Sequence, residues 1–302
     1  MIIDIHTHVA DIRTPAMMDR APVTFENLIA RLDEEGIDKA VLLPLGNTAE
    51  STPLPFIFSE YPDVVSLLRE GARHPNRLIL FGCFDPRMGG NKADTDFSWI
   101  LDRFIEMGCV GIGEVTPNLQ ADDPRVVNMF RQCGKKNLPL IIHGNAVGAG
   151  SYGLTDIPGS PHLARLLAAA PEATVIGHGP GFWAEIGGGL TLEQKALYPQ
   201  GTYSDEGSLW RLLRTYPNLY ADISANSGRN AIARNEEAGI RFLNEFQDKV
   251  LFGSDVCFGD AQGRMPHLAI LRGMLAKGQI SRTVFDKITV GNALKVMPRY
   301  KG

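Results

Sequence analysis

Two histidines, His6 and His8, lie at the end of a short apolar run near the start of the chain, residues 2–5. On a β-strand, residues spaced two apart point to the same face of the sheet. An apolar strand that ends in His-x-His therefore presents two imidazoles side by side, which is half of a protein metal site. The alternative is a histidine pair that only fills the core, and ligands from other strand ends would decide between the two interpretations.

Four more residues with metal-binding side chains each end a short apolar run. They are Glu114 in VGIGE, His143 in LIIH, His178 in VIGH and Asp255 in LFGSD. Taken singly, each has an ordinary explanation; Asp255, for example, could cap the helix that follows it. Imidazole nitrogens and carboxylate oxygens that converge on one end of a set of strands form a zinc-type site. We therefore expect these four residues to join His6 and His8 around a divalent metal.

The chain alternates β-branched runs with amphipathic segments at helical spacing. We expect strands at 2–5, 39–43, 77–84, 110–114, 139–143, 173–178, 219–223 and 249–255. We expect helices at 24–36, 63–72, 95–107, 124–136, 161–170, 205–215, 232–248 and 261–276, with further helix to 297 and a long loop at 179–204.

Eight strand–helix units predict a (β/α)8 TIM barrel with extra C-terminal helices, formed by one domain over residues 1–302. An open doubly wound sheet is the second possibility. The glycine-rich dinucleotide turn that such a fold carries after its first strand is missing, and His-x-His stands in its place.

Composition excludes several classes of function. The formal net charge of -4 provides no basic surface for nucleic acid or an anionic membrane. The four cysteines are scattered without a CxxC pair, which argues against a disulfide framework and a thiolate zinc site. No apolar stretch is long enough to span a bilayer, and the N-terminus has no basic leader. We expect a cytoplasmic protein that acts on a small molecule and binds neither nucleic acid nor membrane. A homodimer is the candidate oligomeric state.

The combination of these motifs resembles a known group of proteins. IDIHTH on the first strand, histidines ending the fifth and sixth strands, and GSD on the eighth resemble the amidohydrolase superfamily of metal-dependent barrels. The segment ITVGNALKVM is similar to the ending of its amidohydrolase-related (type 2) branch. The resemblance covers essentially the whole chain. It implies that His6, His8, His143 and Asp255 bind metal, and that His178 is either a ligand of a second metal or a catalytic histidine.

Glu114 departs from the pattern of that branch. Decarboxylases of the branch use one zinc and have no bridging carboxylate on the fourth strand, whereas other amidohydrolases, TatD-type hydrolases among them, bridge two metals there. We favour two ions, with Zn²⁺ as the expected metal. One would be held by His6, His8, Glu114 and Asp255, and the other by Glu114, His143 and His178. The one-ion alternative uses His6, His8, His143 and Asp255.

The expected activity is hydrolysis of an amide, ester or lactone bond in a small molecule, because metal lowers the pKa of bound water toward neutrality. Asp255 is the expected base, and His178 would polarise the substrate carbonyl when it is not a ligand. A zinc-dependent non-oxidative decarboxylase and a non-catalytic metal-binding barrel stay open as alternatives.

Specificity is expected from loops that follow the strands. The candidates are Arg13, Asn47, Arg87, Asn118, Asn145, Trp183, Asn226, Arg229, Cys257 and Phe258. An arginine in such a loop suits a carboxylate or a phosphate. Trp183 lies in the glycine-rich segment GPGFWAEIGGG, where we expect it to form a lid.

Overall fold

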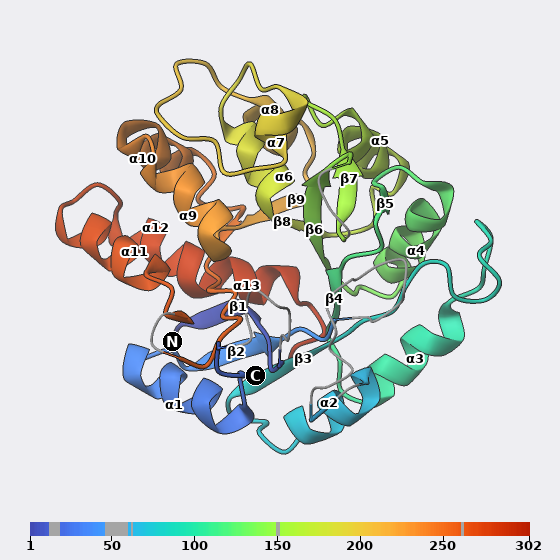
Figure 1. The fold of residues 1–302 in the computed structure, drawn as a ribbon. Helices are drawn as coiled ribbons and strands as arrows, with labels where there is room; N and C mark the ends of the chain where they lie inside the picture. The colour runs from blue at the N-terminus through green and yellow to red at the C-terminus, as the bar shows by residue number, and fades with distance from the viewer. Residues whose placement is uncertain (12–18, 46–59, 62, 149–151, 261–262) are drawn as a thin grey trace.

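The protein forms a barrel of parallel strands surrounded by helices (Figure 1). The computed structural model describes residues 1–11, 19–45, 60–61, 63–148, 152–260 and 263–302. The barrel strands follow in the order β1 (Ile3–Thr7), β2 (Lys39–Leu42), β3 (Leu78–Gly82), β4 (Gly111–Val115), β6 (Leu140–Ala146), β8 (Val175–His178), β9 (Leu219–Asp222) and β10 (Val250–Leu251). These eight strands confirm the predicted (β/α)8 fold.

The last strand returns to the first, so the sheet curls into a nearly closed barrel rather than an open doubly wound sheet. The amide of Ile5 donates to the carbonyl of Phe252 at 3.0 Å. Thr7 and Val256 form a parallel bridge one step further along. Both contacts join the β1 segment to the segment that follows β10. They therefore bring His6 and His8 close to Asp255.

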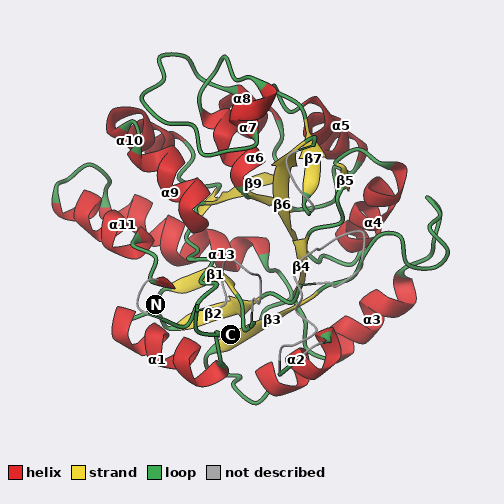
Figure 2. Ribbon diagram, in the orientation of Figure 1, coloured by secondary structure: helices red, strands yellow, loops and turns green. Residues whose placement is uncertain are grey.

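Helices cover the outside of the barrel, as Figure 2 shows. They are α1 (Phe25–Glu35), α2 (Val64–Gly71), α3 (Ser98–Glu106), α4 (Pro124–Lys135), α5 (Pro161–Ala169), α8 (Ser208–Thr215), α9 (Ala225–Ala233), α10 (Glu236–Glu245), α11 (His267–Ala276) and α12 (Arg282–Asp286). Local sequence explains their ends: Thr24 caps α1 through a capping box, and Gly36 ends it in the left-handed conformation with φ 67°. Among the described residues, none of these helices has the length and apolar character needed to cross a bilayer.

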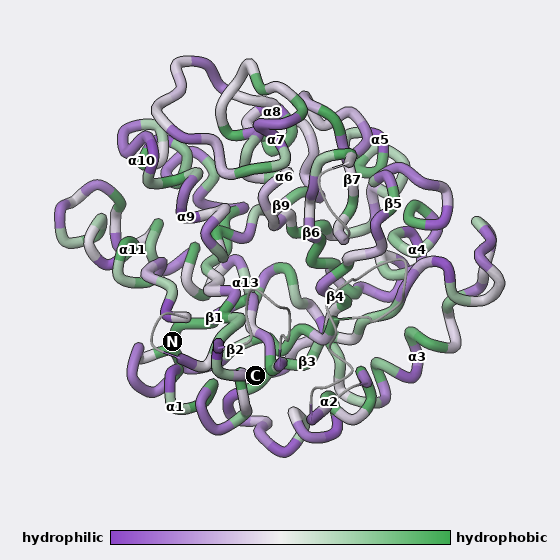
Figure 3. The backbone as a smooth tube through the Cα atoms, in the orientation of Figure 1, coloured by the Kyte–Doolittle hydropathy of each residue, from purple (hydrophilic) through white to green (hydrophobic). Residues whose placement is uncertain are grey.

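The core has two layers, because alternate residues of each strand face opposite sides. Val41 and Ile79 point into the barrel, where they pack with the C-terminal α13 (Asn292–Val296). Their neighbours Leu42 and Leu80 point outward to the helices. Figure 3 shows hydrophobic residues along the inner strands and hydrophilic ones along much of the outer rim.

Two strands interrupt this alternation where predicted ligands lie. The β4–β6 register shifts between Ile112 and Val115, and both of these side chains pack in the outer layer. Glu114, between them, is thereby turned into the barrel. The register between β1 and β2 also shifts, in the stretch from Asp4 to Thr7 that contains His6. Such irregularities re-aim side chains near functional sites.

The structure corrects several predicted boundaries. Residues 179–204 are not a plain loop, since they contain α6 (Pro180–Trp183), the 3-10 helix η2 (Ala184–Ile186) and α7 (Leu192–Lys195). Tertiary contacts stabilise these short pieces: Lys195 on α7 is fully buried and donates to Glu185 at 2.7 Å. The helix predicted at 232–248 corresponds to the shorter α10, and α9 before it was not predicted. Two short strands, β5 (Leu119–Gln120) and β7 (Leu154–Asp156), were not predicted.

Candidate metal centre

Hydrogen-bond acceptors on the outer side of each ring hold His6, in β1, and His8, just after it, in one tautomer. Nδ1 of His6 lies 2.7 Å from Oδ2 of Asp222, and Nδ1 of His8 lies 2.9 Å from the carbonyl oxygen of Leu43. Because an ionised carboxylate and a carbonyl can only accept, each Nδ1 carries the hydrogen and each neutral ring turns an Nε2 lone pair inward. The two Nε2 atoms are only 3.0 Å apart. Two lone pairs at this distance repel each other, and a shared cation would remove the conflict.

A third imidazole is oriented in the same way. The hydroxyl of Ser224 donates to Oδ2 of Asp222 at 2.6 Å and so accepts from Nδ1 of His178 at 2.8 Å. The Nε2 atom of His178 therefore also presents a lone pair to the centre. Asp222 thus positions two imidazoles, His6 directly and His178 through Ser224.

Asp222 was missed in the sequence. It ends β9 in the segment LYAD and its side chain is fully buried. The signal was present, since a carboxylate at the end of a barrel strand is the same cue that indicated Asp255. Outer carboxylates of this kind fix the orientation and basicity of metal-binding histidines.

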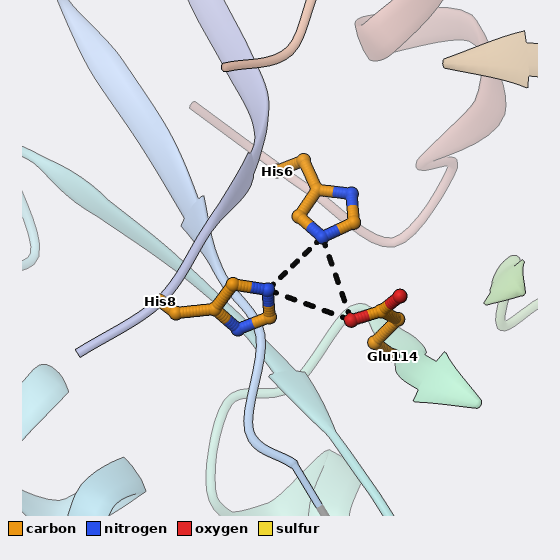
Figure 4. Close-up of side chains that lie close together, drawn as sticks. All are labelled: His6, His8 and Glu114. Carbon is orange, nitrogen blue, oxygen red and sulfur yellow. Dashed lines mark hydrogen bonds and ion pairs between the residues drawn. The ribbon is translucent and has the colours of Figure 1, made fainter. Parts of the chain in front are cut away.

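Glu114 faces different imidazoles with its two oxygens. Its Oε2 lies 3.7 Å from Nε2 of His6 and 3.5 Å from Nε2 of His8 (Figure 4). Its Oε1 lies 2.7 Å from Nδ1 of His143 and 3.9 Å from Nε2 of His178. A carboxylate with this arrangement has one oxygen available for each of two neighbouring ions.

Asp255 closes the cluster from the segment after β10. Its Oδ1 lies 3.3 Å from Nε2 of His8 and 3.6 Å from Nε2 of His6, and its Oδ2 lies 3.5 Å from Nε2 of His178. Its backbone adopts the left-handed conformation with φ 53°, which is uncommon for a residue other than glycine. The amide of Asp255 donates to the carbonyl of His6 at 2.8 Å, which fixes this position.

The six predicted ligands therefore lie together. Their ligand atoms fall within 4.8 Å of one another in three sets, His6–His8–Glu114, His6–His178–Asp255 and Glu114–His143–His178. Nitrogen and carboxylate oxygen are the donors that zinc accepts. His143 turns Nδ1 toward the cluster, at 2.7 Å from Glu114, so its unpartnered Nε2 lies on the opposite edge of the ring. The donor set fits a divalent metal.

Charge in the cluster also favours a cation. Burial opposes ionisation of Glu114, but the charge of His143 and the contact with His6 hold the pKa of that carboxyl well below its ordinary value. Burial likewise opposes ionisation of Asp255, whose pKa is lowered by His6, His8 and His178. Burial alone would lower the pKa of His6, yet Asp255 and Asp222 raise it well above its usual range. Without a metal, these carboxylates favour a second proton on the His6 ring, at the place where a bound cation would otherwise balance their charge.

Arg87 and Asn145, two of the predicted specificity residues, make hydrogen bonds within the protein. The guanidinium of Arg87 already has protein partners, since Nη1 donates to Asp85 at 2.8 Å and Nη2 donates to the carbonyl of Pro117 at 2.5 Å. Asn145 donates to the carbonyl of Tyr152 at 3.1 Å and so holds a segment at the mouth of the barrel. Arg13 and Asn47 lie outside the described residues.

The prediction that Trp183 forms a lid is wrong. Its side chain is 1% exposed and packs against Phe182 and Phe242. Its indole nitrogen donates to the backbone carbonyl of Asp222 at 2.8 Å. The glycines around it let the chain turn inward, so Trp183 supports the end of β9 from the core. Sequence reasoning instead missed Tyr152, whose ring lies 4.5 Å from that of His143.

Barrel and cluster together define a metal-enzyme architecture whose site lies at the carboxyl ends of the strands. The family model described as amidohydrolase matches residues 3–299. The chain therefore belongs to the amidohydrolase family, whose members are metal-dependent enzymes. None of the curated proteins compared with the chain matches it in sequence.

Solved structures share this fold at low sequence identity. An amidohydrolase from Burkholderia multivorans with bound zinc is 13% identical, with a TM-score of 0.61 and 99% of each chain covered. A probable 2-pyrone-4,6-dicarboxylic acid hydrolase from Acinetobacter baumannii with bound citric acid is 15% identical, with a TM-score of 0.58, 98% of this chain and 99% of that chain covered. The 5-carboxyvanillate decarboxylase from Sphingomonas paucimobilis is 15% identical, with a TM-score of 0.59 and 98% of each chain covered.

Proposed function

We propose that this protein is a metal-dependent hydrolase that cleaves an amide, ester or lactone bond of a small molecule. The observation that carries the proposal is the convergence of three imidazole lone pairs with the carboxylates of Glu114 and Asp255 at one end of the barrel. A divalent metal, for which we favour Zn²⁺, would supply a Lewis acid that lowers the pKa of water toward neutrality. The neighbour from Burkholderia multivorans holds zinc, which supports this choice.

We infer that the centre holds two ions. The division of the Glu114 oxygens between His6 and His8 on one side and His143 and His178 on the other supports a bridging role. The first ion would be held by His6, His8, Glu114 and Asp255, and the second by Glu114, His143 and His178. Two-ion sites of this kind have metals about 3.5–4 Å apart, a separation that the two oxygens of one carboxylate can bridge.

Asp255 is the proposed proton acceptor. Its side chain is 14% exposed, whereas that of Asp222 is fully buried, so Asp255 is the aspartate of the cluster that substrate can reach. Its lowered pKa keeps it ionised at rest. As the more accessible aspartate of the cluster, it would take a proton from the attacking water and return it to the leaving group. Asp222 and Ser224 would instead keep His6 and His178 in their tautomers.

Decarboxylation and hydration occur on the same fold and have to be tested alongside hydrolysis. Similar structures include the 5-carboxyvanillate decarboxylase and a 4-oxalomesaconate hydratase from Rhodopseudomonas palustris. The position of Glu114 between the two groups of histidines favours hydrolysis. A decarboxylase that uses one zinc would not need a carboxylate to bridge two ions. A non-catalytic barrel is disfavoured, since all six ligand positions are filled.

The test is an activity screen of the zinc-loaded chain. Panels of small esters, lactones and amides are followed by acid release, and hydroxylated benzoates are followed by carbon dioxide release. The proposal predicts turnover in the first panel that disappears on chelation and returns with zinc. Metal-dependent release of carbon dioxide without any hydrolysis would instead support the decarboxylase, and metal binding without turnover in either panel would support the non-catalytic barrel.

A further inference from the structure

Outside the proposed metal centre, one face of α9, the helix that follows Ser224, borders a cavity. A cavity of about 500 Å³ is lined by Tyr198, Gln200, Asn226, Arg229, Asn230, Ala233 and Arg234. Four of these residues recur at positions one helical turn apart on α9, so they share one face of the helix. Within the described part of the chain, the lining contains two arginines and no aspartate or glutamate.

Arg229 is the first of the two arginines in this lining. Its side chain is exposed and, across the described residues, makes no hydrogen bond or ion pair. Other arginines of the molecule are used differently: Arg125 is paired with Asp123, and Arg214 with both Glu206 and Glu245. An arginine left free at the wall of a cavity is available for a ligand.

Arg234 also has guanidinium atoms without hydrogen-bond partners among the described residues, and it is more buried than Arg229. Its Nε and Nη2 atoms are buried and have no hydrogen-bond partner among the described residues. Its Nη1 reaches only the carbonyl of Gly201 at 3.4 Å, and its guanidinium lies 4.8 Å from the ring centre of Tyr203. Partial burial lowers the pKa of Arg234, which reflects the cost of a half-buried cation with no anion among the described residues.

The chain links one end of the cavity wall to the proposed metal ligands. Asn226 comes two residues after Ser224, which holds His178, and the amide of Ala225 donates to the carbonyl of Ser254 at 3.2 Å, beside Asp255. From Asn226 the wall runs outward by one turn, about 5 Å, to Arg229. Arg229 therefore lies one turn along the helix whose first residues contact the segments that carry His178 and Asp255.

We propose that this cavity is a subsite for an oxyanion, a carboxylate or a phosphate, which the substrate carries at a distance from the bond that is cleaved. Arg229 and Arg234 are the anion's partners, and Asn226 donates a further hydrogen bond. Guanidinium groups bind both oxyanions through paired hydrogen bonds. The assignment of the anion to a substrate rests on the proposed function, whereas binding of an anion at this place does not.

The test measures binding without turnover. Glutarate and inorganic phosphate are titrated separately into the full-length, zinc-loaded chain at low salt by calorimetry. Arg229→Gln and Arg234→Gln are compared with Arg73→Gln, which removes an exposed arginine before β3, at the opposite end of the barrel. We expect the first two variants to lose about 10- to 100-fold in affinity, because a hydrogen bond to a charged group contributes about 1.5–3 kcal/mol. Arg73→Gln should bind as the parent chain does.

Preference for glutarate would identify a carboxylate and preference for phosphate a phosphate group, and both results support the subsite. Arg229→Gln decides the outcome, because Arg229 is exposed and contacts no partner in the part of the chain that the structure describes, so its loss should leave the fold intact. Arg234, by contrast, packs on Tyr203. The proposal is overturned if the parent chain binds neither probe, or if affinity falls on removal of zinc but not in Arg229→Gln. Loss of probe affinity in Arg229→Gln with no hydrolysis in the activity screen would leave the subsite standing and remove the hydrolase proposal alone.

Discussion

Oδ2 of Asp222 lies 2.7 Å from Nδ1 of His6, and both side chains are fully buried. The same oxygen accepts from Ser224, which in turn accepts from His178. One carboxylate on β9 therefore sets the tautomers of two imidazoles on β1 and β8. We expect metal affinity to depend on a residue that is not itself one of the proposed ligands.

Replacement of Asp222 tests this dependence. Asp222→Asn keeps the shape but puts an amide beside His6, so Nδ1 of His6 no longer has a carboxylate acceptor. We expect zinc affinity, measured by competition with a chelator, to fall about 10- to 100-fold. Asp205→Asn, an exposed aspartate, is the matched control. Unchanged affinity in Asp222→Asn would show that the imidazoles are oriented without it.

Asp255→Asn separates proton transfer from metal binding. The amide can no longer accept a proton, so we expect a folded, largely zinc-loaded protein whose turnover is lower by about 10²- to 10⁴-fold. Turnover of the substrate found in the screen and zinc content are measured on the same sample. Near-normal turnover would remove Asp255 from the role of base.

A buried ion pair stabilises the segment between β8 and α8. Lys195 donates to Glu185, Ser160 and the carbonyl of Gly181 at 2.7, 3.1 and 2.8 Å and is fully buried. Lys195→Met leaves Glu185 buried without its cation, and we expect the free energy of unfolding to fall by about 3–5 kcal/mol. The double variant Lys195→Met/Glu185→Gln should recover part of this loss in urea unfolding. Equal stability of the single variant and the parent would contradict the account.

His267 links stability to pH. Burial lowers its pKa to about 4, from an ordinary value of 6.5. Below pH 6.5 the unfolded chain takes up a proton that the folded chain refuses, so stability falls between pH 6.5 and 4 and the loss levels off below that range. The full loss is about 3 kcal/mol, at about 1.4 kcal/mol for each pKa unit.

The variant His267→Gln keeps a donor for the carbonyl of Ala225, which His267 contacts at 2.9 Å, but does not titrate. We expect its stability to decline less steeply than that of the parent over this pH range, with both proteins kept in chelator so that metal loss plays no part. Parallel curves for the two proteins would contradict the shifted pKa.

Much of this fold was predictable because strand and helix periods alternate strictly along the chain. The six proposed ligands were found for the same reason, since each lies at or just beyond the end of a strand. The orientation of Glu114 was not predictable: continued alternation from Ile112 would have pointed it at the outer helices, and the register shift in β4 turns it inward. Trp183 was misplaced because its core contacts with Phe242 and Asp222 come from distant parts of the sequence.

The central claim is that Glu114 bridges two ions, and metal content per chain tests it most directly. Protein purified without chelator is analysed for zinc by mass spectrometry together with Glu114→Ala and the exposed control Glu26→Ala. The account predicts close to two ions in the parent and in Glu26→Ala, and one or fewer in Glu114→Ala. One ion in the parent, unchanged in Glu114→Ala, would contradict the bridge and make the one-zinc decarboxylase the leading alternative.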